Sequence, residues 1–171
     1  MDRPVIHLEM TDPNQLHPAR PSPPIIVTEV SESAAALIGR LYNEIWTPLG
    51  GGGRKLWRPE TWGTELHQPG VRTWLADFDG QPVGFAELEW RGDGNVAIVV
   101  IGIVPALQGK GVGGDFLTRM TSLAWQTPAP NGTPTARVWL WTSIPNEHPG
   151  TIPNYLARGY RQSQAAGEST A

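Results

Sequence analysis

The feature that most constrains this chain is a glycine-rich turn between an apolar run and a helix-like pattern. Residues 95–104 are almost wholly apolar and β-branched, which predicts a strand buried on both faces. Four glycines follow within residues 108–114, and residues 113–126 repeat apolar side chains at helical spacing. Glycine lets the backbone approach a ligand closely, and a helix start adds free N–H groups and a partial positive charge. The pattern therefore predicts a cradle for an anion such as a pyrophosphate.

Two common phosphate-binding motifs do not fit this turn. The glycines formally satisfy G-x-G-x-x-G, but residues 105–108 separate them from the strand. A dinucleotide-binding fold also needs an acidic residue about 20 positions later, and residues 116–146 contain no Asp or Glu. A Walker loop is excluded because Val104 stands at its first glycine and Gly111, instead of Ser or Thr, follows Lys110.

The composition predicts one globular domain and excludes several classes of function. A chain of 171 residues with 39% hydrophobic and 17% charged residues suits a single core. The net charge of −3 gives no general attraction to nucleic acid or membranes, and no signal peptide or membrane-spanning run is visible. The absence of cysteine removes disulfides, thiolate nucleophiles and cysteine-based metal sites. We therefore expect a cytoplasmic protein with no metal.

The rest of the chain predicts an α/β domain with consecutive hairpins in its middle. Residues 1–24 read as an arm with an edge strand at residues 4–10 and a proline-rich connector, and residues 163–171 read as a flexible tail. The main domain, residues 25–162, carries the other elements. Its expected strands are residues 25–30, 71–78, 82–90, 95–104, 137–143 and 160–161, and its expected helices are residues 32–46, 59–67, 113–126 and 152–158.

A different phosphate motif does match the turn. Residues 108–113 read Gln-x-x-Gly-x-Gly, between a strand that ends before a proline and an amphipathic helix. Upstream, residues 80–87 form a hairpin segment, Gly-Gln-Pro-Val-Gly-Phe-Ala-Glu. Downstream come Asn-Glu-His-Pro at residues 146–149 and Tyr-x-x-x-Gly-Tyr at residues 155–160. With these elements in order, the chain resembles the GNAT superfamily of N-acetyltransferases from about residue 25 to 161.

This resemblance implies a fold and a co-substrate. The fold is a single domain with a mixed, mostly antiparallel central sheet flanked by helices. Its central strands, here residues 95–104 and 137–143, splay apart to admit acetyl-CoA. The segment Leu-Glu-Met-Thr-Asp-Pro, residues 8–13, is also similar to the leader of a bacterial subgroup of unclear substrate. The residues that the resemblance places against acetyl-CoA are Ile103, Val104, Gln108, Gly109, Lys110, Gly111, Val112, Gly113 and Asn146.

Those residues would have different tasks. The resemblance implies that the backbone of Ile103 and Val104 and the side chain of Asn146 hold the pantetheine arm. Backbone N–H groups of residues 108–113 would hold the pyrophosphate, and Lys110 would add a point charge.

The implied reaction is direct attack of a neutral amine on the thioester carbonyl, which needs a base, an oxyanion stabiliser and an acid for the leaving thiolate. Tyr155 matches the general acid of the family. The strand where many members carry a basic glutamate has Ala97 instead. Glu87 on the preceding hairpin, His148 and water remain alternative bases. The alternative for Glu87 is that it makes a salt bridge or faces solvent.

The acceptor site of the family maps to residues 42–67, where two kinds of side chain suggest opposite substrates. Aromatic rings favour a flat or cationic acceptor, and basic groups favour an anionic one. These side chains are Trp46, Trp57 and Trp62, and Arg54, Lys55 and Arg58. The alternative is that the aromatic side chains form a cluster that closes the core. We expect an N-acetyltransferase for a small-molecule amine. A protein or peptide N-acetyltransferase and a non-catalytic acyl-CoA-binding module are the alternatives. A homodimer is compatible with the sequence.

Overall fold

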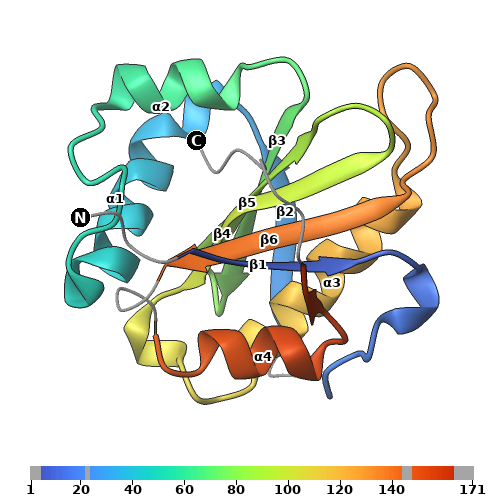
Figure 1. Cartoon of the computed structure of the whole chain (residues 1–171). Helices are drawn as coiled ribbons and strands as arrows, with labels where there is room; N and C mark the ends of the chain where they lie inside the picture. Colours follow the sequence, from blue (N-terminus) through green and yellow to red (C-terminus); the bar gives the residue numbers. More distant parts are fainter. Residues whose placement is uncertain (1–4, 22–23, 144–147, 164–171) are drawn as a thin grey trace.

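A seven-stranded mixed sheet forms the centre of the computed structural model, which describes residues 5–21, 24–143 and 148–163 (Figure 1). The strands lie in the order β2 (Ile25–Val30), β3 (Val71–Phe78), β4 (Gln81–Trp90), β5 (Asn95–Ile103), β6 (Arg137–Ser143), β1 (Val5–Met10) and β7 (Arg161–Gln162). Neighbours are antiparallel except β5 and β6, which are parallel. The expected mixed, mostly antiparallel sheet in one domain is confirmed.

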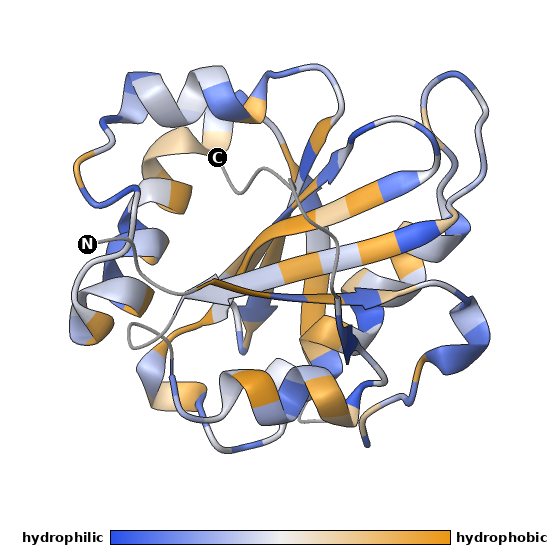
Figure 2. Ribbon diagram, viewed as in Figure 1, coloured by the Kyte–Doolittle hydropathy of each residue, from blue (hydrophilic) through white to orange (hydrophobic). Residues whose placement is uncertain are grey.

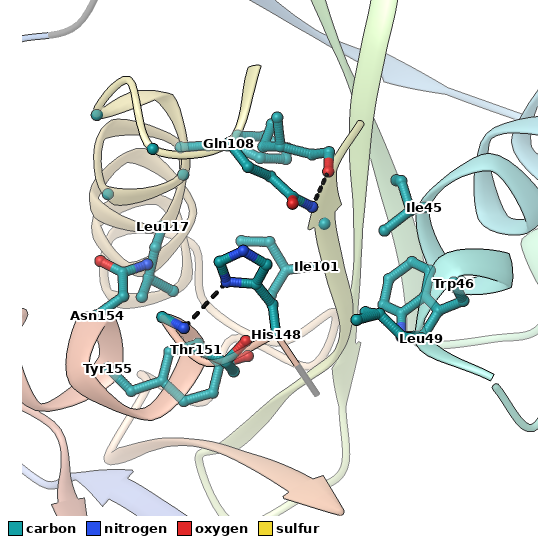
Figure 3. A pocket seen from close by; sticks show the side chains of 18 residues that line it. Ile45, Trp46, Leu49, Ile101, Gln108, Leu117, His148, Thr151, Asn154 and Tyr155 are labelled. Atoms are coloured by element: carbon teal, nitrogen blue, oxygen red, sulfur yellow. Dashed lines mark hydrogen bonds between the residues drawn. The ribbon is translucent and has the colours of Figure 1, made fainter. Parts of the chain in front are cut away.

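Four helices cover the two faces of the sheet. The helices are α1 (Ala35–Trp46), α2 (Pro59–Leu66), α3 (Val112–Gln126) and α4 (Thr151–Ala157). Helices α1 and α2 pack on each other and on β3, β4 and β5, whereas α3 contacts β5 and β6. Figure 3 shows α1 and α3 on opposite sides of β5. Figure 2 shows that hydrophobic residues concentrate on the central strands, which the helices cover.

The local patterns predicted most element bounds to within one or two residues. Strands β3 and β6 have the expected limits. The turn between β3 and β4 has positive φ angles of 51° at Asp79 and 76° at Gly80, as expected for an Asp-Gly hairpin. No helix in the described part of the chain is both long and apolar enough to cross a membrane.

The expectation of an edge strand in the N-terminal arm is wrong. Strand β1 lies between β6 and β7 and pairs with both, from Val5 opposite Ser143 to Met10 opposite Val138 on the β6 side. The connector that follows also contacts the domain, since the Ala19 N–H donates to Thr118 Oγ1 on α3 at 3.0 Å. The arm therefore forms an inner strand of the sheet. The sequence did not predict this position, because an alternating strand pattern indicates which face is buried but not which strands are its neighbours.

The parallel pair at the centre of the sheet separates early. Strands β5 and β6 are paired from Asn95 opposite Arg137 only as far as Ala97 opposite Trp139. Beyond these residues β5 continues to Ile103 and β6 to Ser143 without further pairing between them. This confirms the expected splay, and it leaves one edge of β5 uncovered on the way to the glycine-rich turn.

Candidate active site

The uncovered edge of β5 borders a cavity of about 290 Å³ (Figure 3). Its walls come from the end of α1, the end of β5, the glycine-rich turn with α3, and the start of α4. The lining residues are Ile45, Trp46, Leu49, Ile101, Gly102, Ile103, Gln108, Gly109, Gly111, Gly113, Gly114, Phe116, Leu117, His148, Gly150, Thr151, Asn154 and Tyr155. The cavity therefore reaches both faces of the sheet past the end of β5.

The glycine-rich turn presents backbone to one end of this cavity. Gly109 and Gly111 have φ angles of 77° and 82°, which side-chain-bearing residues rarely adopt. A Cβ added at Gly109, Gly111 or Gly113 would have no heavy atom within 4 Å, so the surface above the turn is open. Helix α3 begins at Val112, and its first N–H groups have no partner within the helix. The geometry therefore fits a bound anion such as a pyrophosphate.

The side chains of the other predicted cofactor-binding residues in this turn do not all face the cavity. Lys110 is exposed and does not line the cavity. The Val112 side chain is 1% exposed in the core, so only its backbone faces the turn. The Gln108 side chain folds back and donates from Nε2 to the Ile103 carbonyl at 3.1 Å. Gln108 thus fixes the turn against the end of β5.

The backbone of Val104 is already engaged, contrary to the expectation that it holds the pantetheine arm. Its N–H donates to the Val83 carbonyl at 2.8 Å, and its carbonyl accepts from the Leu107 N–H at 3.0 Å. Because backbone groups alternate direction along an antiparallel ladder, those of Ile103 and Ile101 point to the opposite edge of β5. That edge faces the gap, so Ile101 and Ile103, and not Val104, direct backbone groups toward the cavity.

Helix α4 brings Tyr155 to the cavity. Tyr155 is 8% exposed and lies with its ring 6.4 Å from that of Tyr160. Thr151 and Asn154 line the cavity from the same helix, at the i, i+3 and i+4 positions that share one face. The sequence reasoning missed these two residues, although their helical spacing to Tyr155 would have indicated them. Asn146 lies outside the described residues.

His148 projects into the middle of the cavity, between α3, α4 and β5 (Figure 3). Its Nδ1 accepts the Gly150 N–H at 3.0 Å. A neutral imidazole has one donor and one acceptor nitrogen, so this hydrogen bond leaves the proton on Nε2. His148 therefore presents a donor to the cavity, which suits binding of an oxygen atom better than removal of a proton from an amine.

Glu87 does not line the cavity and is held by an ion pair. Its carboxylate is 1% exposed and accepts from both terminal nitrogens of Arg54, at 2.9 and 3.0 Å. The Arg54 guanidinium also lies 4.4 Å from the Trp57 ring and 5.3 Å from the Trp62 ring. Burial lowers the pKa of Arg54, but the hydrogen bonds and charge of Glu87 outweigh this effect and raise it. The geometry favours the salt-bridge alternative for Glu87 over the role of general base.

A second carboxylate approaches the same guanidinium. Glu65 on α2 lies 3.5 Å from Arg54 Nη2. Burial, followed by the nearby charge of Glu87, raises the pKa of Glu65.

No group of three or more acidic, histidine or cysteine side chains in the described part of the chain is arranged to hold a metal ion.

The comparisons with known proteins identify the architecture around this cavity. The model of the acetyltransferase (GNAT) family matches residues 38–148, more than half of the chain. Comparison with curated proteins gives no significant match in sequence.

Solved structures with the same fold are numerous and distant in sequence. An acetyltransferase from Thermus thermophilus is 19% identical, with a TM-score of 0.62 over 84% of this chain and 90% of that chain. A predicted acetyltransferase with acetyl-CoA from Clostridium acetobutylicum is 13% identical, with a TM-score of 0.62 over 85% of this chain and 96% of that chain.

Some similar structures are longer than this chain. A GCN5-related N-acetyltransferase from Kribbella flavida is 18% identical, with a TM-score of 0.59 over 94% of this chain. The chain spans 54% of that structure, and 60% of a GNAT acetyltransferase from Novosphingobium aromaticivorans.

Proposed function

This chain belongs to the GNAT acetyltransferase family, and on that premise we propose that it transfers the acetyl group of acetyl-CoA to the primary amine of a small molecule. The observation that carries the proposal is the cavity along the unpaired edge of β5, which joins the glycine-rich turn to Tyr155. An acyltransferase needs both ends of such a path, one for the anionic part of the donor and one for the reacting thioester.

The residues at the turn fit the diphosphate of CoA. The open surface above Gly109, Gly111 and Gly113 and the start of α3 offer backbone N–H groups and a favourable helix dipole. The backbone of Ile101 and the N–H of Ile103 would bind the amide groups of the pantetheine arm along the edge that β6 leaves free, since the Ile103 carbonyl already accepts from Gln108. We propose no separate ionic contact for Lys110, whose exposed side chain adds only long-range attraction.

The residues at the other end would handle the protons of the transfer. The neutral amine nitrogen attacks the thioester carbonyl carbon, the C–N bond forms and the C–S bond breaks. Tyr155 would give its phenolic proton to the leaving thiolate, and the nitrogen would release one proton to solvent. The Tyr155 phenolate would then take one proton back from solvent, so no net proton is gained or lost by the enzyme. His148 Nε2 would stabilise negative charge on the carbonyl oxygen, because its Nδ1 is held by Gly150. The products are an amide and the CoA thiol.

The size and boundaries of the cavity support a small acceptor. A volume of about 290 Å³, bounded by α1, α3 and α4, is at the lower end of the range of small-molecule sites, and the donor would occupy part of it. A protein or peptide acceptor would have to reach the thioester through this cavity.

Thiol release from acetyl-CoA with a panel of amines, together with CoA titration by calorimetry, tests the proposal. We expect CoA to bind and at least one small amine to give turnover. Tyr155→Phe should lower kcat by about 100-fold or more and leave the Kd for CoA unchanged. Tyr160→Phe is the matched control, because the Tyr160 hydroxyl is buried against Thr121 Oγ1 at 2.6 Å, away from the cavity.

Three results would count against the proposal in different ways. Absence of CoA binding would exclude the donor. Tight CoA binding with no turnover for any amine or peptide would favour the acyl-CoA-binding module. Turnover with peptides alone would favour the peptide acetyltransferase.

A further inference from the structure

We infer that the acceptor is a weakly basic amine attached directly to a flat apolar group, such as an aromatic amine, and not a polycation. This inference rests on the proposed function and concerns the acceptor side of the same cavity. It follows from where the structure places the aromatic and basic side chains of residues 42–67. In the sequence, these side chains suggested opposite kinds of acceptor.

The acceptor side of the cavity is apolar and aromatic. Ile45, Trp46 and Leu49 line it on the α1 side of β5, opposite the side where α3 and the glycine-rich turn lie (Figure 3). A Cβ at Gly102 would lie 2.8 Å from Trp46 Cη2 and 3.0 Å from Ile45 Cγ2, so both side chains rest directly on the β5 backbone. The donor would arrive from the turn, and this wall would face the group that attacks it.

The indole of Trp46 is held in place by other rings. It stacks on Tyr42 with ring centroids 4.6 Å apart and an angle of 16° between the planes, and its centroid lies 6.4 Å from that of Phe85. A fixed aromatic wall favours a flat apolar group. The Trp46 ring offers contact area to such a group, and because the ring is already held in place, binding costs it little further conformational entropy. Leu49 and Ile45 extend the same apolar surface.

Arg54 is paired with carboxylates and is not available to an acceptor at this wall. Arg54, which could have bound an anionic acceptor, donates both terminal nitrogens to Glu87. Trp57 and Trp62, which could have stacked on a cationic acceptor, already contact the Arg54 guanidinium. Arg54, Trp57 and Trp62 therefore meet in one cluster outside the cavity, and of the three tryptophans in residues 42–67 only Trp46 lines it.

The basicity of the amine supports the same class of acceptor. An alkylamine with a pKa near that of lysine, about 10.4, is neutral in only about one molecule in 2,500 at pH 7. Such an acceptor needs a base, but Glu87 is held by Arg54 and His148 Nδ1 by Gly150. An amine bonded to an aromatic ring is already neutral at pH 7, because its lone pair is delocalised into the ring. The acceptor that fits the apolar wall thus also needs no prior deprotonation.

The test compares aniline, benzylamine and spermidine as acceptors, with each kcat/KM divided by the uncatalysed rate with acetyl-CoA. We expect the corrected value for aniline to exceed that for benzylamine at pH 7 by about tenfold or more. Between pH 7 and 9 the uncorrected kcat/KM for benzylamine should rise with its neutral fraction, by up to about tenfold per pH unit, while the uncorrected kcat/KM for aniline stays level. Spermidine as the best acceptor would overturn the inference while leaving the proposed function intact. Lack of turnover with all amines would instead refute the proposed function.

Two variants test the wall itself. Trp46→Ala should raise the KM for aniline about tenfold with an unchanged Kd for CoA, and Trp46→Phe should restore most of the affinity. Leu56→Ala, at a side chain that is 85% exposed, is the control and should change neither value. Leu49→Asp places a carboxylate on the wall and should shift the preference toward benzylamine by about tenfold. Unchanged acceptor KM and preference in folded Trp46→Ala and Leu49→Asp proteins would refute the assignment of the wall.

Discussion

Removal of Arg54 from its ion pair with Glu87 should destabilise the protein more than removal of the Glu87 carboxylate. Both groups are largely withdrawn from water, with side-chain exposures of 14% and 1%. In Arg54→Met, the Glu87 carboxylate would stay buried opposite an apolar side chain. Leaving a buried charge without its partner costs about 3–5 kcal/mol. For a chain of this length we expect the Tm to fall by about 10 °C.

Removal of the carboxylate should cost less. In Glu87→Gln the amide oxygen still accepts a hydrogen bond, and Arg54 retains Glu65, which lies 3.5 Å away, and some contact with solvent. We expect a loss of about 1.5–3 kcal/mol, the range for one hydrogen bond to a charged group. The double variant Arg54→Met/Glu87→Leu should be close to the wild type, because it leaves no buried charge.

Urea unfolding followed by tryptophan fluorescence measures these differences, since the chain has eight tryptophans. A double-mutant cycle with the single variants Arg54→Met and Glu87→Leu and the double variant Arg54→Met/Glu87→Leu isolates the coupling between the two residues. The reasoning would be refuted if Arg54→Met cost less than about 1 kcal/mol, or if Glu87→Gln cost more than Arg54→Met.

Three further outcomes follow from the structure. Gly111→Ala, at φ 82°, should weaken CoA binding by about tenfold in calorimetry. Gly132→Ala, at φ 86° in a distant turn, should strain the backbone similarly without affecting CoA binding. Equal CoA affinities of the two variants would contradict the assignment of the glycine-rich turn as the anion site. Gly102→Ala should lower the free energy of unfolding, measured with urea, by about 1–3 kcal/mol, because its Cβ would lie 2.8 Å from the Trp46 ring. An unchanged free energy of unfolding would show that the ring moves freely. Burial and the charge of Glu87 raise the pKa of Glu65, so the folded state favours its protonated form and loses stability as the pH rises through that pKa. Glu65→Gln removes this loss, so its stability relative to the wild type should increase from pH 4 to pH 7, and a pH-independent difference would refute this cause.

The elements that the sequence predicted well are those whose structure depends on nearby residues. Strand β6 has the expected limits because β-branched and aromatic residues fill it and polar loops bound it. The hairpin at Asp79 and Gly80 and the start of α3 at the glycine-rich turn depend on a few consecutive residues. Strand β1 was recognised as a strand, but its place between β6 and β7 depends on hydrogen bonds to segments more than 120 residues away.

The candidate site divides in the same way. The glycine-rich turn could be recognised because its residues are consecutive and its chemistry is that of the backbone. The engagement of Val104 with Val83 and the entry of Ile101 into the cavity could not, because the direction of each backbone group depends on the register between β4 and β5. The same holds for Trp46, which lines the cavity, and for Trp57, which contacts Arg54 instead.

The sequence by itself determined the elements that we assign to the donor: a strand, a glycine-rich turn and a helix start. Only the tertiary structure decided the acceptor side. It joined Arg54 to Glu87, which lie 33 residues apart, and so removed both the expected base and the expected cationic site from the cavity. The physical reason is that a backbone cradle is made by local dihedral angles, whereas the charge and shape of a cavity depend on which distant side chains meet after the chain has packed.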